Sequence, residues 1–419
     1  MKLGKFLLSC GAVAIIAGTS MGLSAELRTW TDKKGRTLEG KLKELDGTEA
    51  VIQLKAGKEV RIDRKTLSAG DNEYLNEYGG GEVVVATGKV GKPEKDAKID
   101  TKSFEKLKDP FLFPDTEIVL DALQTEHFLV LTAGSVRPKD IAETAERMWQ
   151  GMAFQHPTFA EKWGDERRAI FVIEDEGIYA EIGEWYGKYL EKNDKQNEAV
   201  KLSMTWDKAS GGSLVVPPYA VEQYNLMERA RIFRVTSSNK SAYKKVFTPF
   251  VTHCLANDMV TTQMGATSGF GSAGRFAITT GHAYYKEIQL AGESGTSLIS
   301  AEYDSDEITK SRGFANGTSW AKELKKLVRK GDAVPSIEKL YAYKVETLKP
   351  EELVLAYSFS YFMQSEMSRL TAYTKMIERA DSSRNIPAPI EVAKIFGFES
   401  VEKLEEAWTE FIKSTAFKD

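Results

Sequence analysis

The first 25 residues constrain the chain most, because they set where it folds and which cysteines it keeps. Lys2 and Lys5 precede an apolar run at 6–17, and small residues continue to Ala25. This order is typical of a secretory signal peptide. The run is shorter than the roughly 20 residues that a membrane-spanning helix needs. We therefore expect cleavage and a secreted or periplasmic bacterial protein, with no membrane insertion afterwards.

Cleavage removes Cys10, one of only two cysteines, and leaves Cys254. A single thiol cannot form an internal disulfide, so packing must stabilise the fold. The 42% of hydrophobic residues is enough for a substantial core. The 57 basic and 61 acidic residues nearly balance, which argues against a nucleic-acid partner. Nothing in the composition implies a cofactor.

Residues 26–78 predict a small β domain. Turn sequences at 32–35, 46–47 and 56–57 separate short alternating runs at 38–42, 50–54 and 59–62. Asp-Gly between such runs is a strong hairpin signal. Four or five short strands in about fifty residues suit an SH3-like barrel, closed by a helical turn at 68–75 with Ser68 as its cap.

This segment resembles the Sla homology domain, first described in a yeast endocytic and actin-assembly adaptor and also found in secreted bacterial proteins. The resemblance rests on Arg28 to Asp32, Gly35, Asp46-Gly47, Val51, Leu54, Gly57, Val60, Ile62, Leu67-Ser68, Asp71 and Tyr74-Leu75. It implies an SH3-like barrel that binds proteins, including cytoskeletal ones, through extended peptides. Lys55 matches a peptide-binding lysine of the family when a one-residue gap is allowed. Trp30 is a second peptide-binding candidate, with barrel core as the alternative role for its ring.

Residues 79–116 are rich in glycine and alternating charge and read as a flexible linker. Residues 117–416 then predict an α+β domain, with strands first and helices after. Strands are expected at 118–120, 127–131 and 169–173 and a long helix at 138–163. After about residue 217 nearly everything is expected to be helical, at 243–263, 275–290, 350–379 and 400–414.

This second domain resembles secreted gluzincin-type metallopeptidase domains of the MA clan. Residues 125–132 and 168–174 look like the family's first strands, and pieces at 353–359, 393–398 and 404–408 look like its helical C-terminal part. In that family a His-Glu-x-x-His helix binds zinc, since two imidazoles at i and i+4 share one helical face.

The zinc motif is degenerate in this chain. His253 keeps the first ligand position, Cys254 replaces the general-base glutamate, and Asn257 replaces the second histidine. The glutamate ligand of the next helix corresponds to Thr280. A catalytic zinc generally needs three protein ligands and a base for its bound water. The resemblance thus implies a pseudo-peptidase without a metal or a catalytic residue.

Two alternatives remain open at this point. Cys254 is a candidate nucleophile with His282 as its base, although no papain-like or caspase-like sequence surrounds it. His253 is a candidate ligand for another metal, together with Asp258 or His282. The glycine-rich stretch 265–274 lacks the lysine of a phosphate-binding loop and is expected to be a flexible loop.

Together these patterns predict an exported, non-catalytic protein- or peptide-binding protein. An Sla-homology domain would be tethered to a pseudo-metallopeptidase domain. The alternative is an active hydrolase, either metallopeptidase-like or dependent on the thiol of Cys254.

Overall fold

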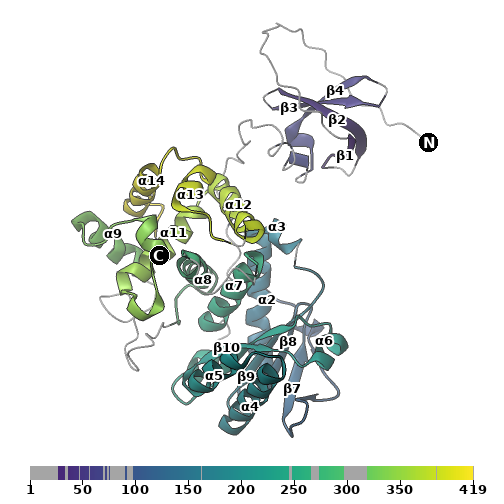
Figure 1. The fold of residues 1–419 in the computed structure, drawn as a ribbon, viewed down its shortest axis with the longest axis vertical. Coiled ribbons are helices and arrows are strands. Elements are labelled where there is room, and N and C mark those ends of the chain that lie inside the picture. Colours follow the sequence, from purple (N-terminus) through teal and green to yellow (C-terminus); the bar gives the residue numbers. More distant parts are fainter. Residues whose placement is uncertain are drawn as a thin grey trace. The chain divides into compact units, whose positions relative to one another are not determined.

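The computed structural model gives an α+β protein with antiparallel strands near the N-terminus and a largely helical C-terminal part (Figure 1). The structure describes residues 27–33, 36–46, 48–55, 57–68, 71–72, 75, 90–91, 98–161, 163–244, 248–265, 273–296, 319–383 and 385–418. The expected signal peptide and most of the glycine-rich stretch lie outside these residues. The chain divides into two compact units, Met1–Val85 and Ala86–Asp419.

The first unit contains one antiparallel sheet in the order β1-β2-β3-β4. Its strands are β1 (Leu27–Thr31), β2 (Thr37–Asp46), β3 (Glu49–Leu54) and β4 (Glu59–Asp63), which confirms the three predicted alternating runs. A 3-10 turn at Arg64–Thr66 follows, and an antiparallel bridge joins Asp32 to Leu67. The core consists of Trp30, Leu42, Ala50, Ile52, Leu67 and Leu75.

A buried carboxylate ties the end of this unit back to its first strand. Asp71 accepts hydrogen bonds from Arg28 Nη2 at 2.7 Å, from the Thr31 amide at 2.6 Å and from Ser68 Oγ at 2.9 Å. Ser68 Oγ in turn accepts from the Asp71 amide at 3.2 Å, as expected for a capping serine. The sheet, its core and this tie all lie within residues 27–75.

The second unit is built on a mixed sheet in the order β10-β11-β9-β8-β7-β5, with β6 paired to β7. The strands are β5 (Glu105–Lys106), β6 (Phe111–Leu112), β7 (Val119–Gln124), β8 (Phe128–Ala133), β9 (Arg168–Ile173), β10 (Gly211–Val215) and β11 (Arg229–Arg234). β8, β9 and β11 are mutually parallel. The structure therefore differs from the predicted linker at 79–116, because β5 and β6 already belong to this sheet and Phe111 is fully buried.

Helices cover both faces of this sheet. In β8, Phe128 and Val130 point to one face and Leu129 and Leu131 to the other, and all four are fully buried. One face packs against α2 (Pro138–Gln155) and α7 (Pro249–Gln263). The other packs against α4 (Glu176–Lys192) and α5 (Gln196–Thr205), with α6 (Pro218–Tyr224) nearby. Such doubly covered strands read as continuous apolar runs.

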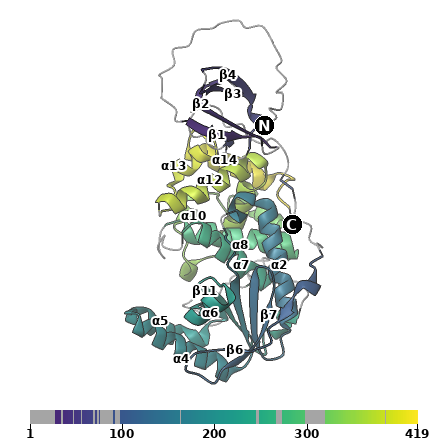
Figure 2. The same cartoon turned by 90° about the vertical axis from the view of Figure 1, so that its right-hand side faces the viewer.

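The remaining helices gather at the end of this unit away from α4 and α5 (Figures 1 and 2). They are α8 (Arg275–Ala291), α9 (Trp320–Lys330), α10 (Ile337–Tyr341), α11 (Pro350–Met363), α12 (Met367–Ser383), α13 (Pro389–Ile395) and α14 (Val401–Lys413). α8 and α14 lie close to their predicted bounds, whereas α7 begins at Pro249, six residues after its predicted start. No helix among the described residues is long and apolar enough to cross a membrane.

Three helix predictions are corrected. The segment 138–163 is broken, because Pro157 starts a separate short helix, α3 (Pro157–Ala160), and disfavours helical backbone at His156. The segment 350–379 is two helices, which meet at 364–366. Finally, β11 follows residue 217 as a strand, where helices were expected. It pairs with β10, which precedes it closely in the sequence, and with β9, which lies about sixty residues earlier.

Candidate functional site

Two adjacent helices, α7 and α8, carry every degenerate zinc position of the sequence analysis. His253, Cys254 and Asn257 lie on α7, and Thr280 lies on α8. The helices pack along each other, and α8 also packs on α11. Gly281 allows that second contact, since a Cβ atom there would lie 2.3 Å from the carbonyl oxygen of Ala356. Thr280 thus lies on a helix between α7 and α11, while Cys254 and Asn257 are only partly buried.

His253 is held by a carboxylate that the sequence analysis did not single out. Its Nδ1 lies 3.0 Å from Oε2 of Glu287, whose side chain is fully buried. The Tyr284 ring meets the imidazole edge-on, with 4.4 Å between the ring centroids. Neither Asp258 nor His282 pairs with His253 in the described residues. Asp258 instead accepts from Arg231 Nε at 2.9 Å.

Glu287 is saturated by the segment that follows α8. Its Oε1 accepts from the amides of Gly295 at 2.7 Å and Thr296 at 3.1 Å, and from Thr296 Oγ1 at 3.0 Å. Ser294 Oγ lies 3.3 Å from Oε2. We call His253, Glu287 and residues 294–296 the Glu287 cluster. With five contacts on one buried carboxylate, it links α7, α8 and the following loop.

The other two ligand positions do not join this cluster. Asn257 is partly exposed and accepts a 3.4 Å hydrogen bond from Thr261 Oγ1, and Thr280 is 5% exposed. Within the part of the chain that the structure describes, no three His, Cys, Asp or Glu side chains are grouped to hold a metal. The residues at these positions therefore do not fit a zinc ion.

Cys254 and His282 are not arranged as nucleophile and base. Burial raises the pKa of the Cys254 thiol to about 12, although the charge of Arg231 acts in the opposite direction. A thiol with such a pKa is a poor nucleophile near neutral pH. His282 Nδ1 lies 2.8 Å from the Tyr373 hydroxyl and 3.3 Å from Gln364 Nε2. Its ring stacks on that of Tyr373.

The two peptide-binding candidates of the first unit have different environments. Trp30 is 1% exposed, and its indole nitrogen donates to the Gly40 carbonyl at 3.0 Å. Its ring is therefore part of the core. Lys55 lies at the exposed turn between β3 and β4, where its amine pairs with Glu39. Gly57 shapes this turn with a φ of +78°.

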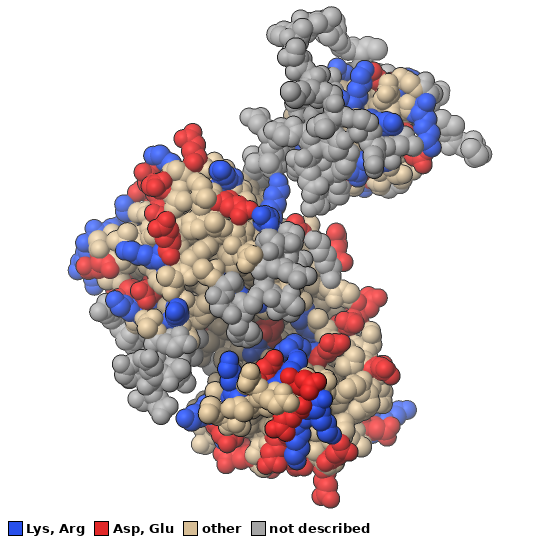
Figure 3. Space-filling model, in the orientation of Figure 1, with Lys and Arg blue, Asp and Glu red and all other residues tan. Residues whose placement is uncertain are grey.

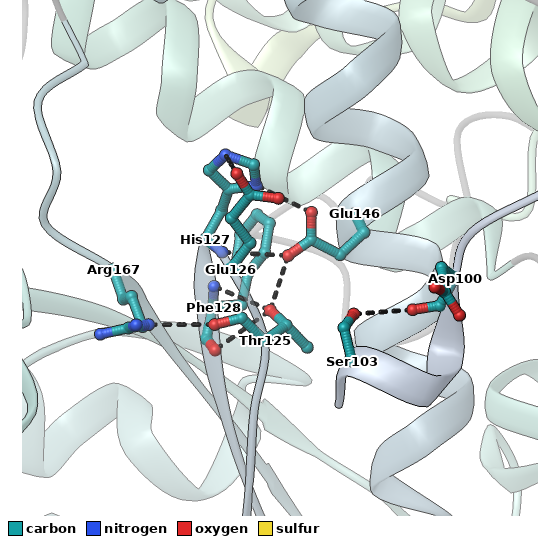
Figure 4. Close-up of polar contacts among 8 residues, drawn as sticks. All are labelled: Asp100, Ser103, Thr125, Glu126, His127, Phe128, Glu146 and Arg167. Carbon is teal, nitrogen blue, oxygen red and sulfur yellow. Dashed lines mark hydrogen bonds and ion pairs between the residues drawn. The ribbon is translucent and has the colours of Figure 1, made fainter. Parts of the chain in front are cut away.

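A further polar group, at the start of β8, was missed from the sequence (Figure 4). Buried Glu146 of α2 accepts from Thr125 Oγ1 at 2.6 Å and from the His127 amide at 3.0 Å, and it contacts His127 Nδ1 at 2.8 Å. Burial alone would raise the pKa of Glu146, but the hydrogen bonds from His127 and Thr125 lower it. The signal available in the sequence was Glu146 itself, an acidic residue on the otherwise mainly apolar face of α2.

Comparison with known proteins gives no relative. No family model, curated protein or solved structure matches the chain. The face of the molecule drawn in Figure 3 carries basic and acidic side chains side by side, as the nearly balanced composition leads one to expect.

Proposed function

We propose that the chain is an exported, non-catalytic protein- or peptide-binding protein. In this proposal the first unit is an SH3-like barrel of the Sla-homology type. The second is a gluzincin-like domain that has lost its zinc chemistry. The partners are proteins or extended peptides.

One observation carries the non-catalytic part of the proposal. The only histidine retained from the zinc motif, His253, has its Nδ1 engaged by Glu287 in a cluster that is already saturated. Around it, positions 254, 257 and 280 offer a thiol, an amide and a hydroxyl. The raised pKa of Cys254 also argues against a thiol-dependent hydrolase.

The binding part of the proposal centres on Lys55 and β4. β4 is the last strand of its sheet as described, with Glu59, Arg61 and Asp63 exposed. An edge strand can pair with an extended peptide, and nearby side chains then select its sequence. The side chain of Lys55 is 64% exposed and its partner Glu39 is 55% exposed. Such a surface ion pair is weak, so an acidic group on a peptide can displace it.

A peptide display library selected on the mature chain tests this proposal. An enriched peptide should bind both the mature chain and a fragment of residues 26–78. Lys55→Ala should weaken binding about tenfold, the equivalent of roughly 1.4 kcal/mol. Lys41→Ala is the matched control, since Lys41 is an exposed lysine of the same sheet on β2, which is not the strand proposed to bind the peptide.

Binding that persists in residues 86–419 and is indifferent to Lys55→Ala would place the function in the second unit. Hydrolysis of peptides that is abolished by a chelator or by alkylation of Cys254 would favour the alternative, an active hydrolase.

A further inference from the structure

A second buried polar cluster lies where α2 ends against α8, α11 and α12. Its bases are His156 at the end of α2 and His282 and Lys286 on α8, and we call these three side chains the basic cluster. They are 0–1% exposed. Gln155, Ser360, Gln364 and Tyr373 surround them. Lys286 follows His282 by one helical turn, so both project from the same face of α8.

The basic cluster is incompletely hydrogen-bonded. Lys286 Nζ contacts Gln155 Oε1, and His282 Nδ1 contacts Tyr373 and Gln364. In contrast, Nε2 of His282, Ser360 Oγ and Gln364 Oε1 make no hydrogen bond of ordinary length and angle with the described residues. The same holds for both ring nitrogens of His156, although the Gln364 side chain lies close enough to raise the pKa of His156 against the larger, lowering effect of burial. Turning the Gln364 amide over exchanges its oxygen and nitrogen, but it cannot satisfy all of these atoms. Buried polar groups without partners are rare in native proteins.

These groups occupy one small region. The ring centroids of His156 and His282 are 5.8 Å apart, and that of Tyr373 lies 5.8 Å from His156 and 5.7 Å from His282. Ser360 Oγ lies against Gly281, next to His282 in the chain. The unpartnered atoms of His156, His282 and Ser360 thus belong to neighbouring side chains.

The charged groups around the basic cluster are all of one sign or are already paired. Burial lowers the pKa values of His156, His282 and Lys286 well below their usual ranges, and the charge of Lys286 also lowers those of both histidines. No carboxylate contributes to these shifts. Glu287 is engaged by the Glu287 cluster, Glu146 of α2 by His127, and Arg369 of α12 pairs with Glu366.

Charge balance decides which ligand suits this site. A divalent metal held by neutral nitrogen atoms would bring two uncompensated charges into the interior, and a proton alone would bring one. A monovalent anion that arrives with one proton adds no net charge, because the protonated base and the anion form a neutral pair. Uncompensated charge is expensive to bury, whereas a hydrogen-bonded pair is tolerated.

We propose that the basic cluster is a binding site for a small monovalent anion, which enters with one proton taken from solvent. The proton resides on Lys286 as an ammonium group beside the anion. His156, His282 Nε2 and Ser360 provide N–H and O–H donors. Halides and formate share this chemistry.

The test is thermal unfolding of the mature chain in sodium bromide and in sodium sulfate at equal ionic strength. Sulfate generally stabilises proteins by exclusion from their surface, so stabilisation by bromide beyond that of sulfate would be specific. Bromide should raise Tm, and at pH values above the pKa of Lys286 in the free protein its apparent affinity should fall about tenfold per pH unit, as uptake of one proton requires. Formate should compete with bromide.

Lys286→Met should abolish the bromide effect, whereas Lys330→Met, at an exposed lysine of α9, should retain it. A crystal grown with bromide at pH 6 should show its anomalous signal beside His156 and Lys286. If Lys286→Met does not fold, the anomalous signal of bromide in the wild-type crystal decides whether the anion binds here. Three results would each overturn the proposal. The first is a crystal without the bromide signal, and the second is a bromide effect that is independent of pH or retained in Lys286→Met. The third is chelator-reversible binding of zinc or copper that is lost in His156→Asn.

Discussion

Two consecutive residues of α8, Lys286 and Glu287, belong to two buried polar clusters of opposite character. Both side chains are fully buried. Glu287 receives five contacts and compensates a histidine, while Lys286 has one hydrogen-bond partner and lies among further bases. The two clusters are equally inaccessible, so burial alone does not distinguish them.

The difference lies in how completely each cluster is satisfied. A saturated cluster fixes one arrangement of the backbone and leaves nothing for a ligand to improve. An unsaturated cluster costs stability in the free protein, and a ligand that completes it recovers that free energy. We therefore assign a structural role to the Glu287 cluster and a binding role to the basic cluster.

The largest effect is expected from Glu287→Leu. This change leaves the His253 imidazole and the donors of residues 294–296 buried without an acceptor. We expect the free energy of unfolding to fall by about 3–5 kcal/mol. Urea denaturation at pH 8 without halide measures it. Lys286→Met is the matched control at the neighbouring residue and should change stability by less than about 1 kcal/mol. Equal losses in both variants would remove the distinction between the clusters.

Gly281→Ala tests the close packing of α8 on α11. The added Cβ atom would lie 2.3 Å from a backbone oxygen, which cannot move without shifting α11. We expect a loss of about 1–3 kcal/mol. Gly187→Ala on α4 is the control, because nothing lies within 4 Å of a Cβ atom there and alanine favours a helix. If Gly281→Ala left the free energy of unfolding unchanged, α8 and α11 would be able to move apart at little cost.

The pH dependence of stability should reveal the basic cluster. His156 titrates near 6.5 when unfolded but well below that when folded, so the unfolded state binds more protons as pH falls below 6.5. Stability contributed by neutral His156 is thus present above pH 6.5 and is lost as pH falls towards its folded pKa. In buffer without small anions, the slope due to this group should approach about 1.4 kcal/mol per pH unit. His156→Asn should remove the contribution of His156 from this slope. An unchanged slope would contradict the assignment of the pH dependence to His156.

The smallest effect is expected from Cys254→Ser, because Cys254 belongs to neither cluster. It is partly buried against the main core, and replacement by a hydroxyl should cost less than about 1 kcal/mol. With its raised pKa, the thiol should react with iodoacetamide at pH 8 far more slowly in the folded than in the unfolded chain. Rapid alkylation of the folded protein would show a reactive thiol.

Local patterns predicted much of the fold. The apolar runs around Phe128 and Ala169 are fully buried strands, and α7 and α8 lie near their expected positions because helical periodicity is a property of neighbouring residues. β11 was missed, since its place in the sheet depends on parallel pairing with β9 about sixty residues earlier. The join between α11 and α12 has no proline or glycine to mark it.

The polar clusters were harder to predict than the fold. His253, Cys254, Asn257 and Thr280 were found as a degenerate motif, but Glu287 was not. Its contacts come from residues 34 positions before it and 7 to 9 positions after it. No helical spacing encodes such a set. Pro157, by contrast, is visible in the sequence, and a proline at this position is a sufficient reason for α2 to end before His156.

The attachment of Gly91 to α2 has a consequence for the basic cluster. Gln155 donates from Nε2 to the Gly91 carbonyl at 3.4 Å while its Oε1 receives Lys286 Nζ. A Cβ atom at Gly91 would lie 2.9 Å from the Phe154 ring, so the strand of chain passes close over the end of the helix. One side chain, Gln155, therefore joins the backbone at Gly91 to Lys286 of the basic cluster. A change at Gly91 would thus reach Lys286 through the Gln155 amide, without passing through the sheet.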